Sequence, residues 1–196
     1  MILTRTPATE LPFTFEDLKR HCRIDASFIA DDAILLMYAW AVVRNGEFLT
    51  NRIWSECAFT GTIDVRPEVG ASITIPKSPC KVLSAITYAN GNGDENTLET
   101  YLYRLLPSSF EWDGGRPYAK VEVAGEWPLS DRYTFSFKAG WPGTSLPQQM
   151  QQWCFVKVSS YYEQKEDLAS ATRKVVAGLD RSFIDSLLDP YYLPKW

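Results

Sequence analysis

RYTFSFKAGWPGTSLPQQMQQWCFV, residues 132–156, contains the change of pattern that decides the fold. Aromatic and polar residues alternate from Tyr133 to Lys138, which predicts an antiparallel strand with one buried and one exposed face. Pro147 then suits the first turn of a helix. Beyond it, apolar residues recur at helical spacing and share one face: Met150, Trp153, Cys154, Val158 and Tyr161. The chain therefore passes from sheet to helix near residue 145.

Two further helices are expected near the N-terminus, over residues 14–25 and 31–54. Thr14 can cap the first helix, with Asp17 three residues later in a role like that of a capping box. The apolar surface of the second helix is broad, which predicts that it is covered on more than one side. Gly46 is expected to weaken this helix near its end.

The residues between these helical parts have the pattern of strands. NGNGD, residues 90–94, is rich in residues that accept positive φ and predicts a hairpin turn. The strand before it runs through Tyr88, and the returning strand is expected through Leu98 to Tyr103. A short last helix is expected over residues 180–189, because Pro190 cannot continue it.

This order of elements predicts an α+β fold rather than a doubly wound sheet. We expect a small helical bundle, made of two N-terminal helices plus C-terminal helices, with an inserted antiparallel β-sheet module. The predicted boundaries are residues 1–53 and 146–189 for the bundle, 54–145 for the β module and 190–196 for an aromatic tail.

Composition limits the classes of function. The 196 residues carry a net charge of -4, which argues against a basic nucleic-acid-binding surface. The four cysteines have neither zinc-site spacing nor the density of a disulfide scaffold, so buried free thiols are favoured. The N-terminus lacks the pattern of a signal peptide, and no apolar run approaches the length of a membrane span. The aromatic share of 14% is high and indicates interaction surfaces.

Catalytic groups are scarce. His21 is the one histidine, and an adjacent cysteine on a helix points about 100° away from it, so a nucleophile–base pair is not favoured. Asp31 and Asp32 suit a helix start better than a metal site, because no further carboxylates follow at calcium-loop spacing. Glu111 and Asp113 resemble a glycosidase pair only by residue type. We therefore predict no enzyme, no metal and no cofactor.

Two surface features leave alternatives open. Lys19, Arg20 and Arg23 form a small basic cluster, either a solvated helix face or a patch that faces a partner. Three tryptophans beside turn residues could stack on sugars, which would suit a carbohydrate-binding module, or they could fill the core: Trp112, Trp127 and Trp141.

A resemblance to a known family runs over nearly the whole chain. FTFEDLKRHCRID, then DDAILLMYAWAVV ending in FLTNRIW, resembles the paired N-terminal helices of tailed-phage head–tail connector (adaptor) proteins. ITIPKSPCKVLSAITYANGNGDENTL resembles their β-insertion, and FKAGWPGTSLPQQMQQWCFVKVSSYYEQKE resembles the segment that enters their carboxyl helix. LLDPYYLPKW resembles their ending.

The resemblance implies a structural role in a virion. Such proteins form a ring of twelve copies under the portal, extend the DNA channel and dock the next neck or tail-completion protein. DNA passes through the lumen without specific binding, no membrane is involved, and the subunit is made in the host cytoplasm. Candidate residues for subunit contacts or a charged face are Lys19, Arg20, Arg23, Trp40 and Arg44.

The C-terminal segment is the candidate portal anchor. In relatives this segment reaches into the portal, and here it offers Leu188, Pro190, Tyr191, Tyr192, Leu193, Pro194 and Trp196. Each aromatic side chain can bury about 150–250 Å². The prolines reduce the entropy lost on docking. The alternative is that the tail folds back onto its own helices.

Overall fold

The structure, a computed structural model, describes residues 1–90, 93–108, 117–163 and 184–193. Helices and two antiparallel sheets confirm the predicted α+β class. The chain divides into two units. Unit 1 comprises Met1–Thr9 and Ser55–Gly140, and unit 2 comprises Glu10–Trp54 and Trp141–Trp196. Each unit is described by itself below.

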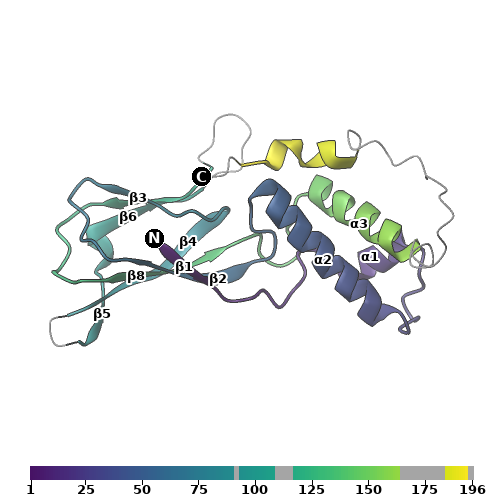
Figure 1. Cartoon of the computed structure of the whole chain (residues 1–196), viewed down its shortest axis with the longest axis horizontal. Helices are drawn as coiled ribbons and strands as arrows, with labels where there is room; N and C mark the ends of the chain where they lie inside the picture. Colours follow the sequence, from purple (N-terminus) through teal and green to yellow (C-terminus); the bar gives the residue numbers. More distant parts are fainter. Residues whose placement is uncertain (91–92, 109–116, 164–183, 194–196) are drawn as a thin grey trace. The chain divides into compact units, whose positions relative to one another are not determined.

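Unit 1 consists of strands in two sheets (Figure 1). The five-stranded sheet has the order β1 (Ile2–Arg5), β2 (Cys57–Ile63), β8 (Tyr133–Ala139), β4 (Cys80–Ala89) and β5 (Glu95–Thr97). The three-stranded sheet has the order β3 (Ser72–Thr74), β7 (Lys120–Val123) and β6 (Tyr103–Leu106), and a 3-10 turn, η1 (Thr100–Leu102), precedes β6. Every strand pair is antiparallel.

The alternation that opens the sequence analysis produces the centre of this unit. β8 pairs with β2 on one side and β4 on the other, and Tyr133, Phe135 and Phe137 are buried on one face as predicted. Phe137 stacks on Phe59 of β2, with 5.4 Å between ring centroids. Trp127 packs against Tyr133 at 5.0 Å. A central strand with aromatics on one face thus organises the core of unit 1.

Two sequence expectations about the strands are wrong. The expected helical part begins at residue 1, but Ile2–Arg5 pairs with β2 as an edge strand. The strand that returns from the hairpin ends at Thr97, and Tyr103 begins β6 in the other sheet. Short strands such as these carry too few residues for a clear period of two.

Unit 2 contains α1 (Phe15–His21), α2 (Asp32–Thr50), α3 (Gln148–Glu163) and the 3-10 helix η3 (Asp185–Tyr191) (Figure 1). Thr14 caps α1 as predicted, because its hydroxyl accepts a hydrogen bond from the backbone N–H of Asp17 at 3.3 Å. The core of the unit includes Leu35, Trp54 and Trp153. The expectation that Pro190 ends the last helix is wrong, because η3 continues through it to Tyr191.

Gly46 has a packing role that helix propensity does not reveal. It lies in the last turns of α2, which continues to Thr50 and ends where Asn51 adopts a left-handed φ of 56°. A Cβ atom at Gly46 would lie 2.1 Å from Cη2 of the buried Trp54 ring. The same indole donates a hydrogen bond to the Thr50 hydroxyl at 2.9 Å. Glycine is therefore needed here because the ring occupies the space of a side chain.

Candidate interaction surfaces

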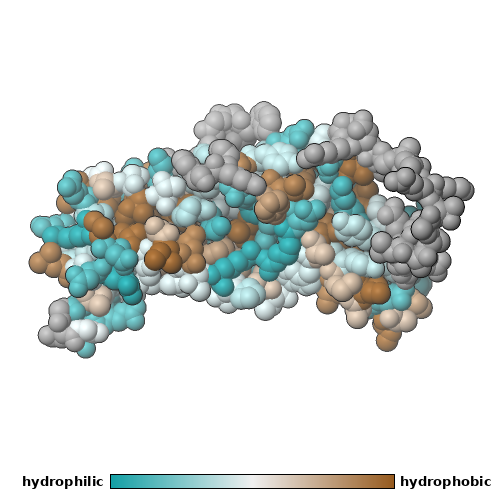
Figure 2. Space-filling view, in the orientation of Figure 1, coloured by the Kyte–Doolittle hydropathy of each residue, from teal (hydrophilic) through white to brown (hydrophobic). Residues whose placement is uncertain are grey.

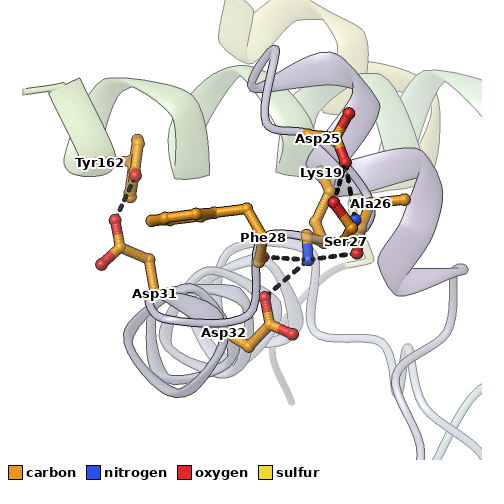
Figure 3. A network of polar contacts seen from close by, with 8 residues as sticks. All are labelled: Lys19, Asp25, Ala26, Ser27, Phe28, Asp31, Asp32 and Tyr162. Carbon is orange, nitrogen blue, oxygen red and sulfur yellow. Dashed lines mark hydrogen bonds and ion pairs between the residues drawn. The ribbon is translucent and has the colours of Figure 1, made fainter.

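Lys19 is a structural residue rather than part of a basic surface patch. Its side chain is buried, with 3% of the residue exposed. The ammonium group donates hydrogen bonds to the carbonyls of Ala26 at 3.1 Å and Phe28 at 2.6 Å, and it pairs with Asp32 at 2.9 Å (Figure 3). These contacts hold the loop between α1 and α2, since all three partners lie in it or at the start of α2. The expectation of a charged face that includes Lys19 is wrong for this residue.

The aspartates that open α2 also have structural roles. Asp32 carries the ion pair to Lys19, and Asp31 accepts a hydrogen bond from the Tyr162 hydroxyl of α3 (Figure 3). Asp25 accepts hydrogen bonds from the Ser27 hydroxyl and backbone N–H, which hold the pKa of its carboxyl below its usual value. Both aspartates lie at the start of α2, as expected, but the Asp31 side chain makes no capping hydrogen bond to the helix.

The remaining residues of the predicted charged face lie on two elements: Arg20 and Arg23 on or just after α1, and Trp40 and Arg44 on α2. Arg20 is exposed and pairs with Asp17 at 2.8 Å. Arg23 is exposed and has a φ of 58°, which follows from its position at the end of α1. Arg44 pairs with Glu47 at 2.9 Å and lies over the ring of Trp40, 5.7 Å from the centroid.

The described part of the aromatic tail packs against unit 2. Leu188 and Leu193 are buried, and the Leu193 backbone N–H donates to the Thr50 carbonyl at 3.0 Å. Arg52 Nε donates to the Tyr191 carbonyl at 2.7 Å, and the Tyr191 hydroxyl donates to Gln149 at 2.9 Å. Burial raises the pKa of the Tyr191 hydroxyl, against the opposing charge of Arg52. The segment through Leu193 is thus an integral part of this unit.

The exposed residues of the tail are fewer than the sequence suggested. Pro190 is exposed and Tyr192 is 41% exposed, whereas Pro194 and Trp196 lie outside the described residues. If the tail has a partner, the described residues that offer surface to it are therefore chiefly Tyr192 and its neighbour Pro190.

Chemistry-bearing residues do not converge on a site in the described part of the chain. Within those residues, no group of three or more histidines, cysteines or acidic residues could hold a metal ion. His21 packs against the Phe155 ring at 5.6 Å. The four cysteines carry thiols that form no disulfide with one another. Burial raises the pKa of the Cys80 thiol to about 11 and that of Cys154 well above its usual value. Glu111 and Asp113 lie outside the described residues.

Two of the three tryptophans considered for sugar stacking, Trp127 and Trp141, are buried and not available for it. Trp127 is fully buried, and its indole donates to the Leu102 carbonyl at 3.1 Å. Trp141 is 7% exposed, and Trp112 lies outside the described residues. The core-filling interpretation of Trp127 and Trp141 is the correct one.

Exposed aliphatic side chains are the feature that sequence reasoning missed. Figure 2 shows apolar residues gathered over the start of α2, and exposed members of this helix include Leu36 and Met37. In unit 1, Val65 and Leu129 are exposed on loops between strands. A signal existed in α2, whose sequence is apolar on every side. The loop residues gave no such sequence signal, because a single exposed valine or leucine on a protein surface is common.

The fold has counterparts among solved structures. The chain is similar to a chain in a structure of the neck of an empty GTA particle computed with C6 symmetry, with a TM-score of 0.73 and 21% identity. The match covers 100% of this chain and 97% of that chain. Its fold is that of a gene-transfer-agent particle protein. A chain in the virion of a native gene transfer agent particle matches with a TM-score of 0.72 and 20% identity. A chain in the neck of a native particle computed with C12 symmetry matches with a TM-score of 0.67 and 22% identity. Both matches cover the same shares of the two chains.

Sequence comparisons add no family assignment. No protein-family model matches the chain, and no curated protein does. None of the described helices is long and apolar enough to cross a membrane.

Proposed function

We propose that this chain is a structural protein of the neck of a phage-like particle. It acts as a head–tail connector (adaptor): a ring of twelve copies beneath the portal extends the DNA channel and docks the next neck or tail-completion protein. The observation that supports this most is the end-to-end likeness of fold to chains of gene transfer agent necks, which leaves no substantial part of either chain unmatched. The role is non-enzymatic, and its place is the head–tail interface of the virion.

The charge of the chain suits this role. With a net charge of -4, the subunit does not offer DNA a dense set of cations. Each phosphate that a protein neutralises adds salt-sensitive affinity, and a ring multiplies every such contact by its number of copies. A channel subunit of acidic character therefore lets genomic DNA pass without holding it.

The portal contact belongs to the end of the chain in this proposal. Leu188 and Leu193 are packed within unit 2, so they fix the segment that carries Tyr192. Tyr192, Pro194 and Trp196 then form the contact with the portal. Repetition around a ring makes such docking multivalent, which allows a weak individual contact to suffice.

The first test is to locate the protein. Particles are purified from a producing strain and from a strain in which the gene is deleted, and both are imaged by cryo-electron microscopy with focused classification of the neck. We expect a ring under the portal that contains this fold, and its loss on deletion with heads that lack tails. A complete neck in the deletion strain would refute the proposal.

A second test examines the tail. A chain that ends at Leu193 is compared with the full chain for binding to the cognate portal ring by native mass spectrometry. Ending the chain at Asp189 would be a poor choice, because it removes the buried Leu193 and its backbone hydrogen bond. We expect the chain that ends at Leu193 to keep its fold and to lose portal binding. Unchanged loading would show that the tail is not the anchor.

A further inference from the structure

Exposed apolar side chains on α2 form a surface that we call the α2 face. It consists of Ile34, Met37 and Phe48, which are 38–68% exposed and lie within about 60° of one another around the helix. At 100° per residue, Met37, Ala41, Arg44 and Phe48 fall along one side of the helix. Arg44 is the one exposed charged side chain of α2, since Asp32 is half-buried and Glu47 is buried. The face is therefore apolar with a single cation.

A second apolar surface lies at one end of unit 1. Strand register shows which segments meet there, because Ile2 is opposite Thr62 and Tyr133 is opposite both Ile63 and Tyr88. The chain start, the β4–β5 turn and the loops after β2, before β6 and before β8 thus share this end, which we call the loop end. Its exposed apolar side chains are Ile2, Val65, Val69, Tyr101 and Leu129, each 61–80% exposed.

The loop end is held in shape and is acidic. Arg66 pairs with Glu126 at 2.8 Å, and Arg132 pairs with Asp64 at 3.0 Å, so the loops after β2 and before β8 are tied together. The loop before β8 is tied to η1 by the Trp127–Leu102 hydrogen bond. Exposed carboxylates outnumber the two arginines there: Asp64, Glu68, Asp94, Glu95, Glu99, Glu126 and Asp131. Such a surface repels nucleic acid and suits a partner that is apolar and cationic.

The two surfaces are of a size to be the two sides of one interface. With roughly 150–200 Å² for a large side chain, the exposed fractions leave about 300 Å² of apolar area on the α2 face and about 600 Å² at the loop end. A standard interface buries about 800 Å² on each partner, and somewhat more than half of it is apolar. A cyclic ring needs two different, complementary surfaces on each subunit.

We propose that the α2 face of one copy docks on the loop end of the next copy. This rests on the proposed function, which requires a ring of identical subunits, and it names the surfaces that join them. Apolar side chains of both surfaces meet, and Arg44 lies among the carboxylates of the loop end. The contact is head-to-tail, so every copy uses both surfaces.

The test uses the full chain in solution. Sedimentation velocity from about 1 to 200 µM measures self-association of the wild type and of two double variants, Met37→Glu/Phe48→Glu on the α2 face and Tyr101→Glu/Leu129→Glu at the loop end. Val82→Glu is the matched control, because Val82 is 57% exposed and belongs to neither surface. Circular dichroism checks that each variant is folded. We expect concentration-dependent association of the wild type and of the control, and at least a 30-fold weaker association of each double variant.

Mixing the variants tests the direction of the contact. Each double variant keeps one intact surface, so an equimolar mixture should form a heterodimer that cannot grow further. Any of three results would overturn the proposal. The mixture could stay monomeric, the double variants could associate like the wild type, or the wild type could be monomeric at every concentration. The proposed function is judged separately by imaging the neck. If the particle contains the ring and these variants still assemble into it, this interface alone is refuted. Association of the expected kind without a place in the neck refutes the function alone.

Discussion

Replacing Gly46 with alanine should destabilise the protein, although helix propensity alone predicts the reverse. Alanine in a helix interior is favoured over glycine by about 1 kcal/mol. At Gly46, however, the new Cβ would lie 2.1, 2.4 and 2.5 Å from three carbon atoms of the Trp54 ring. Real Cβ atoms essentially never lie within 3.0 Å of such an atom, so the ring must move by about an ångström.

The Trp54 ring cannot move without losing other contacts. Its indole N–H donates to Thr50 at 2.9 Å, its backbone N–H donates to the Glu47 carboxylate at 2.9 Å, and its ring meets Trp153 edge-on at 5.6 Å. Overpacking costs about 1–3 kcal/mol. A lost hydrogen bond adds about 1 kcal/mol and a lost aromatic pair about 0.5–1.5 kcal/mol. After subtracting the gain in propensity, we expect a net loss of about 2–4 kcal/mol.

Urea denaturation followed by near-ultraviolet circular dichroism measures this loss. Asn45→Ala is the control, because Asn45 is exposed on the same helix and should gain a few tenths of a kcal/mol from propensity. Gly46→Ala should cost less unfolding free energy in a Trp54→Phe background than in the wild type, because the smaller phenylalanine ring relieves part of the clash. An unfolding free energy for Gly46→Ala equal to or above that of the wild type would refute the packing argument.

Three further perturbations follow from buried contacts. Lys19→Met should cost about 2–4 kcal/mol of unfolding free energy, because Asp32 loses its cation and two carbonyls lose their donor. The control Arg20→Met, at an exposed pair, should change the unfolding free energy by less than about 1 kcal/mol. Leu193→Ala should cost about 2–3 kcal/mol in the same denaturation assay if the tail is part of unit 2, whereas a free tail would show no change. Burial raises the pKa of Cys80 from 9.0 to about 11, so the folded state holds this proton more tightly than the unfolded state. The unfolding free energy should be unaffected below pH 9 and fall by at most about 3 kcal/mol as the pH rises to 11. Cys80→Ala should flatten that part of a pH–stability profile.

The parts of the fold that sequence predicted are those with a long, regular pattern or a specific cap. β8 was predicted because aromatics alternate over its whole length, and α1 because Thr14 begins a capping motif that the structure contains. β1 was missed because four residues at the N-terminus become a strand only through pairing with β2. Such pairing depends on residues more than fifty positions away, and no local pattern encodes it.

Surface and core assignments failed where a side chain's environment comes from a loop. Lys19 lies in a basic run, and charge runs are usually solvated. It is buried because the loop between α1 and α2 turns its carbonyls toward the ammonium group, and Asp32 then supplies the counter-ion. The opposite error concerns aliphatic residues. Val65 and Leu129 are exposed although their types favour burial, and both lie in loops that ion pairs tie together.

Under the proposed function, the order already present in the tail lowers the cost of docking. A peptide that must be ordered on binding loses about 1–2 kcal/mol per residue in conformational entropy. Here η3, the buried Leu188 and Leu193, and the hydrogen bonds of Tyr191 order the segment before any partner arrives. In the proposed portal contact, the segment through Leu193 therefore adds no ordering cost of its own. A chain that ends at Leu193 should consequently match the full chain in unfolding free energy while differing in portal affinity, and a substantial loss of stability in that shortened chain would contradict this division of roles.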